Sequence, residues 1–157
     1  MIDLVRSSAL HALDRAEHLI GIGARAGLME ARLAPGMFTF GEQIAVAVGM
    51  ARRAVLPLIG REANEVDADG KMALRAAIAE ARDAIRAEGA AAARVAHRAG
   101  FADLDQTAED YAARFALPNL WFHLSMAYAV LRANGVAVSK ADFDGLHHYP
   151  KGFMFED

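Results

Sequence analysis

The sequence contains no cysteine and only one tryptophan and four prolines among its 157 residues. The lack of cysteine excludes disulfides, thiolate nucleophiles, iron–sulfur clusters and cysteine-ligated zinc, so any metal would need His, Asp or Glu ligands. The net charge of −3 offers no field for a polyanion, so we expect no nucleic-acid partner. No uncharged run reaches the roughly 20 residues needed to cross a bilayer. Residues 1–6 lack the basic region followed by an apolar run that is typical of a signal peptide. We therefore expect a cytoplasmic protein without a membrane partner.

Hydrophobic residues recur at helical spacing along most of the chain, whose length is typical of one domain. The spacing predicts an amphipathic helix over about residues 2–25. A second helix should begin at Thr39-Phe-Gly-Glu42, which matches a capping box. A third should cover about residues 70–88, with Gly89 as its stop.

The pattern is weaker from Ala90 to Gln106, where a short helix and an extended excursion both remain open. Thr107-Ala-Glu-Asp110 then resembles the cap of a short helix. A last main helix should begin at Pro118 and run to Asn134. Proline fits the first turn of a helix, because the N–H that it lacks would have no intrahelical partner there. It is apolar nearly all round and should be buried on most sides. Four such helices predict an all-α four-helix bundle.

The segment Gly21-Ile-Gly23-Ala-Arg-Ala-Gly27 invites comparison with a phosphate-binding loop. Its spacing differs from the dinucleotide-binding motif, no strand precedes it, and no Walker lysine follows. These glycines are better explained as the loosened end of the first helix and the start of a linker.

Histidines outside the last helix form no pattern typical of a metal site. His147 and His148 are adjacent in a Gly- and Pro-containing tail but lack a fixed third ligand, which favours a solvated or docked tail. His11, His18 and His97 have no paired ligand at helical spacing, so we interpret them as surface or boundary residues.

His123 differs because it lies in an apolar, aromatic-flanked helix. An imidazole there must find a hydrogen-bond partner, bind a metal or accept a depressed pKa. Asn119 lies one turn earlier on the same face. A buried histidine bonded to a neighbouring helix, at Gln43 or Glu42, is favoured over a metal-binding or catalytic one.

The segment Arg114-Phe-Ala-Leu-Pro-Asn-Leu-Trp-Phe-His123 continues into Ala127-Tyr-Ala-Val-Leu-Arg-Ala-Asn-Gly-Val136 and Lys140-Ala-Asp-Phe143. Together these stretches resemble the signature of the helical domain-of-unknown-function family nineteen-ninety-three. Two departures, Ser139 for the usual glycine and Asp144 for an apolar residue, concern the packing of the tail.

That family is placed in the DinB-like superfamily of proposed metalloenzymes. The resemblance implies a four-helix bundle with a crossover between helices 2 and 3, which is often dimeric. Many superfamily members bind a divalent metal through three histidines, and some use the metal to activate a low-molecular-weight thiol. Carried over to this chain, two of the three positions fall on Asn119 and near Gln43, and only His123 remains an imidazole. Carboxamides are weak ligands for zinc or nickel.

We expect a homodimeric DinB-like bundle over residues 1–145 and an irregular tail over residues 146–157. The favoured function is binding of a small polar ligand in a degenerate metal-site pocket formed by Gln43, Asn119 and His123. No cofactor is predicted, and His123 is the one candidate ligand should zinc or nickel bind. The alternatives are a metal-dependent transferase acting on a thiol or small electrophile, completed by Glu42 or the tail histidines, and a homodimeric interaction module.

Overall fold

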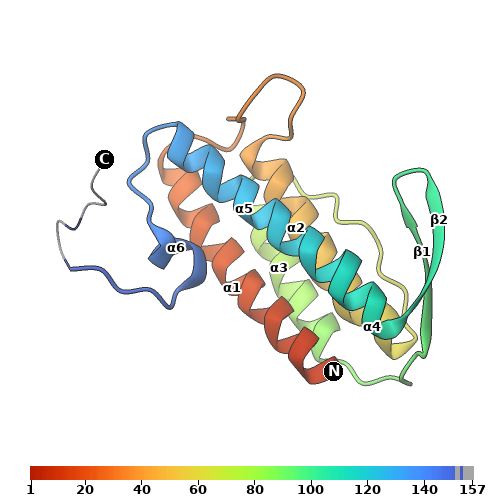
Figure 1. The fold of residues 1–157 in the computed structure, drawn as a ribbon. Coiled ribbons are helices and arrows are strands. Elements are labelled where there is room, and N and C mark those ends of the chain that lie inside the picture. The colour runs from red at the N-terminus through yellow and green to blue at the C-terminus, as the bar shows by residue number, and fades with distance from the viewer. Residues whose placement is uncertain (151–152, 154–157) are drawn as a thin grey trace.

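The computed structural model describes residues 1–150 and residue 153, so part of the expected tail lies outside the described residues. The chain is mostly helical, with a small two-stranded sheet (Figure 1). Its elements in chain order are α1 (Ile2–Arg25), α2 (Phe40–Val55), η1 (Leu56–Ile59), α3 (Gly70–Arg86), β1 (Arg94–Ala99), β2 (Ala102–Thr107), α4 (Ala108–Asp110), η2 (Tyr111–Ala116), α5 (Leu117–Ala133) and α6 (Lys140–Asp144). The all-α prediction was therefore wrong for residues 94–107.

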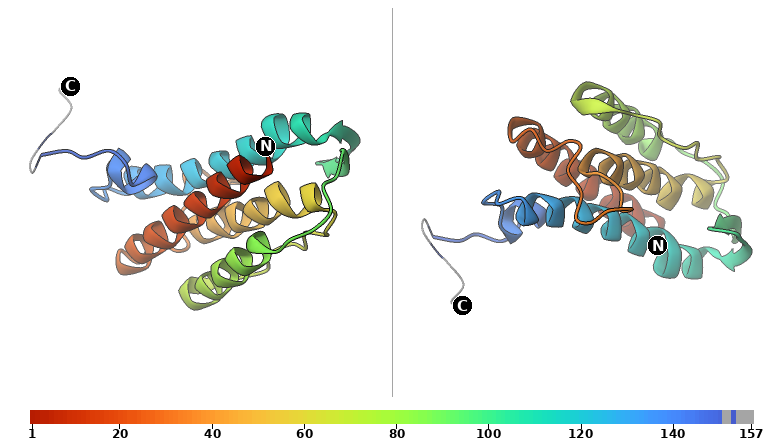
Figure 2. Two further views of the ribbon diagram at one scale, coloured as in Figure 1. Left: turned by 90° about the horizontal axis from the view of Figure 1, so that it is seen from below. Right: turned by 90° about the horizontal axis from the view of Figure 1, so that it is seen from above.

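Helices α1, α2, α3 and α5 lie side by side around a common core (Figures 1 and 2). Each buries one apolar stripe, as the sequence periodicity predicts for α1, α2 and α3. Helix α2 contacts the other three, and it contributes the following fully buried side chains: Phe40, Ile44, Val48, Ala51, Ala54 and Val55. The segment after η1 runs back along α2, with Val66 beside Gly49, so that α3 begins near the amino end of α2.

The start of α2 is fixed by the predicted capping box. The backbone N–H of Glu42 donates to Thr39 Oγ1 at 3.2 Å, and the backbone N–H of Thr39 donates to Glu42 Oε2 at 2.7 Å. The bond from the Thr39 backbone is also the main reason that the pKa of Glu42 is lowered. This cap determines where Gln43, the next residue of α2, is placed.

The glycines near the carboxyl end of α1 do not loosen this helix, contrary to the prediction. The helix runs through Gly21 and Gly23 to Arg25, and the chain turns only after it, at Gly27 with φ of 70°. A Cβ on Gly23 would lie 2.5 Å from Cε1 of the buried Phe40 ring. Gly23 is therefore a packing residue that lets α1 approach α2.

The undecided segment forms an antiparallel hairpin of β1 and β2. Its register pairs Arg94 with Thr107 and Ala99 with Ala102, leaving a two-residue turn that begins at Gly100 with φ of 60°, as type II′ turns require. Helix α3 ends at Arg86, before the predicted stop. Gly89 instead lies against η1, where a Cβ would be 2.3 Å from a backbone carbonyl.

The last helix begins earlier than Pro118. Thr107 caps α4 through a bond from the Asp110 N–H, as expected, but α4 continues through the π-helical η2 into α5 without a break. The Leu117 N–H donates to the Ala112 carbonyl, five residues back. Because Pro118 has no N–H and its ring crowds the preceding turn, the wider π-turn accommodates it.

Helix α5 is buried on one face only, which corrects the prediction of burial on most sides. Leu120, Leu124 and Leu131 are buried, whereas Phe122 is 52% exposed. Part of the remaining surface is covered by α6, whose Phe143 ring lies 5.9 Å from that of Trp121. Within the described part of the chain, no helix is long and apolar enough to span a membrane.

Candidate functional site

The candidate site is centred on a hydrogen bond between α2 and α5. His123 Nδ1 lies 2.8 Å from Gln43 Oε1. Gln43 is only 3% exposed, and a buried carboxamide needs such a partner. The expected bond from His123 to a neighbouring helix is thus present, and its partner is Gln43. The carboxylate of Glu42 is instead engaged in the cap of α2.

The bond to Gln43 determines which ring nitrogen carries the proton. Since Gln43 Oε1 can only accept, the Nδ1–H of His123 donates, and Nε2 of the neutral ring keeps its lone pair. Burial lowers the pKa of His123, so the ring is neutral at pH 7. His123 therefore offers Nε2 as a hydrogen-bond acceptor.

Two aromatic side chains flank the imidazole. The centroid of the His123 ring lies 5.1 Å from that of Phe122, edge to face, and 6.2 Å from that of Phe38. Both phenylalanines are about half exposed. The ring edge thus lies at a surface where a planar molecule could stack.

Asn119 is held by its own helix. Its Nδ2 donates to the Phe115 carbonyl at 2.6 Å, and no hydrogen bond joins it to the His123–Gln43 pair among the residues the structure describes. Its Oδ1 remains an acceptor, one helical turn from His123 on the same face.

The side chains of this site are poor ligands for the divalent metal that the sequence resemblance implies. They comprise one imidazole and two carboxamides, and Gln43 Oε1 already accepts from His123. Zinc and nickel favour imidazole, and zinc also thiolate, over carboxamide oxygen. Nowhere in residues 1–150 or at residue 153 do three His, Asp or Glu side chains form a group that could hold a metal.

A family model described as a domain of unknown function, DUF1993, matches residues 4–144. The chain belongs to the DUF1993 family. No curated protein sequence matches it. It is similar to the crystal structure of a DinB family member protein from Shewanella denitrificans, with 23% sequence identity, a TM-score of 0.70, and 96% of this chain and 92% of that chain covered. At this identity the likeness shows the fold alone, and it confirms that this DUF1993 chain has a DinB-like helical fold.

Four of the other five histidines of the DUF1993 chain make contacts elsewhere. His11 lies 6.1 Å from Trp121, and three others pair with one side chain each: His18 with Asp142, His97 with Gln106, and His147 with Asp144. The His18 bond fastens α6 to α1, and the His147 bond joins the tail to α6. His11, His18 and His97 are half-buried or exposed, in keeping with the interpretation that they are surface or boundary residues.

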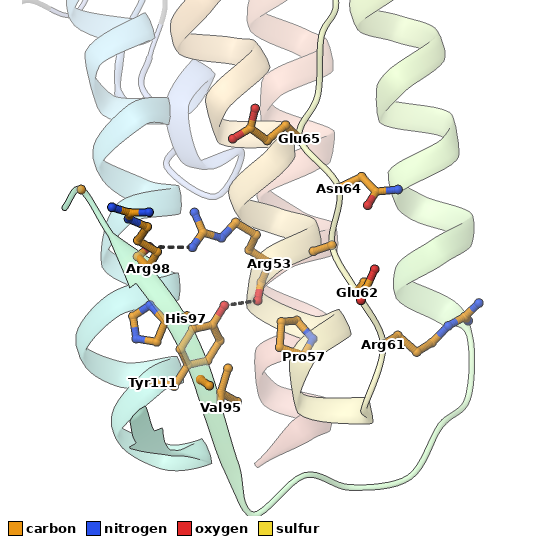
Figure 3. Close-up of a pocket in the computed structure, with 13 residues that line it drawn as sticks. Arg53, Pro57, Arg61, Glu62, Asn64, Glu65, Val95, His97, Arg98 and Tyr111 are labelled. Atoms are coloured by element: carbon orange, nitrogen blue, oxygen red, sulfur yellow. Dashed lines mark hydrogen bonds between the residues drawn. The ribbon is translucent and has the colours of Figure 1, made fainter. Parts of the chain in front are cut away.

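The sequence did not predict a cavity of about 630 Å³ beside the hairpin (Figure 3). Its lining includes Arg53 of α2, His97 and Arg98 of β1, Tyr111 of η2, and the loop of residues 61–65. The hairpin brings His97 and Arg98 to Arg53 and Tyr111, and residues 90–106 showed no decisive periodicity. Gly100, a residue type that favours turns, was the local signal of a hairpin in this segment.

Proposed function

We propose that this DUF1993 protein binds a small, neutral, planar ligand that donates hydrogen bonds at His123. The observation that supports the proposal most directly is the His123–Gln43 bond. It fixes the imidazole on a buried anchor and leaves Nε2 as an acceptor at an aromatic-flanked surface.

The chemistry of the surrounding groups suggests the class of ligand. Nε2 of His123 and Oδ1 of Asn119 are two acceptors one helical turn apart. The half-exposed rings of Phe38 and Phe122 add surface for stacking. Primary amides and related planar N–H donors satisfy both requirements, whereas anions do not.

We further propose that the four long helices form a DinB-type bundle with a crossover between α2 and α3, and that the protein is a cytoplasmic homodimer. The return of residues 60–69 along α2 supports the crossover. Leu4, 74% exposed on α1, offers apolar surface for a second copy. Light scattering should give twice the chain mass, and Leu4→Glu should reduce it to the chain mass.

The ligand proposal is tested by thermal melting and elemental analysis of protein purified without an affinity tag. Benzamide should raise the melting temperature, because a ligand that binds only the native state stabilises it. Methyl benzoate has the same ring but no N–H donor and should have little effect. His123→Ala should abolish the benzamide shift, and His148→Ala, at an exposed tail position, should preserve it.

The metal-dependent transferase is the outcome that would overturn this proposal. Stoichiometric zinc or nickel in the purified protein, lost in His123→Ala, would show that carboxamides complete a metal site here. Equal shifts with benzamide and methyl benzoate would also contradict the proposal, because the ligand's N–H groups would then contribute nothing.

A further inference from the structure

The cavity beside the hairpin is bounded by charged side chains of both signs (Figure 3). Arg53 and Arg98 line it on the side of α2 and β1, and Glu62 and Glu65 line it on the loop that follows η1. We propose that this cavity binds a small zwitterion, such as an amino acid, with its carboxylate at Arg53 and Arg98 and its ammonium group at Glu65.

The two arginines are held close together but lack strong acidic partners. Arg53 Nη2 donates to the Arg98 carbonyl at 3.1 Å, and its guanidinium lies 5.1 Å from the Phe115 ring centroid. No ion pair of Arg53 is found among the described residues, and Arg98 reaches only the exposed Asp103, at 3.8 Å. Guanidinium groups with unused N–H donors suit a carboxylate, and Arg53 and Arg98 both line the cavity.

The opposite wall favours a positive group. The Glu65 side chain extends from the loop toward the side of the cavity where Arg53 lies (Figure 3), and Glu62 adds a second negative charge. Arg61 also lines the cavity, but its side chain extends away from β1 in the same view. A simple anion would be repelled by the glutamates and a simple cation by the arginines, so a zwitterion complements both walls.

The hairpin wall is fixed to the helices before any ligand arrives. The His97 ring lies 4.8 Å from that of Tyr111 and 4.2 Å from that of Phe115, and His97 Nε2 bonds to Gln106 at 2.7 Å. These contacts hold β1 against η2 and thereby position Arg98. The cavity volume of about 630 Å³ lies within the range of small-molecule sites.

This cavity is separate from the proposed ligand site at His123. Gln43 and Arg53 lie on the same helix, about 15 Å apart along its axis. Binding at one site can therefore be tested without reference to the other.

The test is a titration of the ¹⁵N-labelled full chain, followed by the backbone amide signals of residues 95–100 and 62–65. The probes are glycine, γ-aminobutyrate and δ-aminovalerate, which differ in the spacing of their charges, with valerate and pentylamine as analogues that carry one charge. At least one zwitterion should give saturable shifts in both segments and bind more tightly than either analogue. The amide of His123 should not shift.

Matched variants separate the two walls. Arg98→Gln should weaken zwitterion and valerate binding about tenfold, the size expected for loss of a charged hydrogen bond, and should leave pentylamine unaffected. Glu65→Gln should weaken zwitterion binding and leave valerate no weaker. Arg61→Gln removes the same charge as Arg98→Gln from the same cavity and should change little. Absence of saturable shifts with every zwitterion, or equal effects of Arg61→Gln and Arg98→Gln, would overturn the proposal.

Discussion

Replacing Gly23 with alanine tests how closely α1 and α2 approach each other. The added methyl group would lie 2.5 and 2.7 Å from Cε1 and Cζ of Phe40, distances that Cβ atoms do not adopt in stable structures. Phe40 has no exposed surface, so its ring cannot swing aside into solvent. One of the two helices must shift, or the ring must leave its rotamer.

The magnitude follows from two opposed effects. Alanine in a helix interior is favoured over glycine by roughly 0.8–1 kcal/mol, whereas overpacking a core costs about 1–3 kcal/mol. Because two ring atoms overlap, we take the upper part of the overpacking range and subtract the gain in helix propensity. We therefore expect Gly23→Ala to lower the free energy of unfolding by about 1–2 kcal/mol. Gly21→Ala is the matched control in the same helix, because its nearest neighbour is the flexible end of Arg25 at 3.4 Å.

Urea denaturation followed by circular dichroism measures both variants. Gly21→Ala should raise the free energy of unfolding by up to about 1 kcal/mol, and Gly23→Ala should lower it. Adding Phe40→Leu should recover part of the Gly23→Ala loss, because the smaller side chain removes the overlap. If Gly23→Ala is as stable as Gly21→Ala, the close approach of α1 and α2 is refuted.

Three further changes probe the cap, the hydroxyl of Tyr111 and the imidazole. Thr39→Ala should cost about 1 kcal/mol in urea denaturation, because the Glu42 N–H loses its acceptor. Tyr111→Phe should cost about 1 kcal/mol by the same measurement, because the Tyr111 hydroxyl donates to the Arg53 carbonyl at 2.7 Å. Burial lowers the pKa of His123, so as the pH falls the imidazole is protonated in the unfolded chain before it is protonated in the folded one. The free energy of unfolding should therefore be highest above about pH 6.5 and fall as the pH drops through the lowered folded-state pKa.

Each of these predictions has a control. Thr39→Ser keeps the hydroxyl and should retain most of the cap's contribution. Tyr128→Phe removes a hydroxyl whose bond to a carbonyl is longer, 3.3 Å, and should cost less than Tyr111→Phe. The pH dependence assigned to His123 should be smaller in His123→Leu, and an unchanged slope would contradict that assignment.

The helices could be predicted because their signals are local. The capping box at Thr39 and the periodicity of α1 and α3 depend on residues a few positions apart, and the structure confirms them. The start of the last helix before Pro118 was missed, because sequence periodicity does not show where a π-turn will accommodate a proline that lacks an N–H. The role of Gly23 was missed as well, because the ring that requires it belongs to another helix.

Non-local pairing explains what could and could not be predicted at the sites. The His123–Gln43 bond was expected, because an imidazole in an apolar helix must find a partner. The bond from the Tyr111 hydroxyl to the Arg53 carbonyl was not predicted. The available signal was Pro57, which has no N–H and so leaves the Arg53 carbonyl without its usual partner four residues on. The hairpin cavity depends on a strand register that no short window of sequence contains.

The ring nitrogens of His123 provide the most direct test of the proposed function. Long-range ¹H–¹⁵N spectra near pH 7 should show a protonated Nδ1 and an unprotonated Nε2, and benzamide should shift the Nε2 signal as it accepts an N–H. One equivalent of zinc should leave both signals in place. A shift of Nε2 that saturates at one equivalent of zinc, with no response to benzamide, would contradict the account.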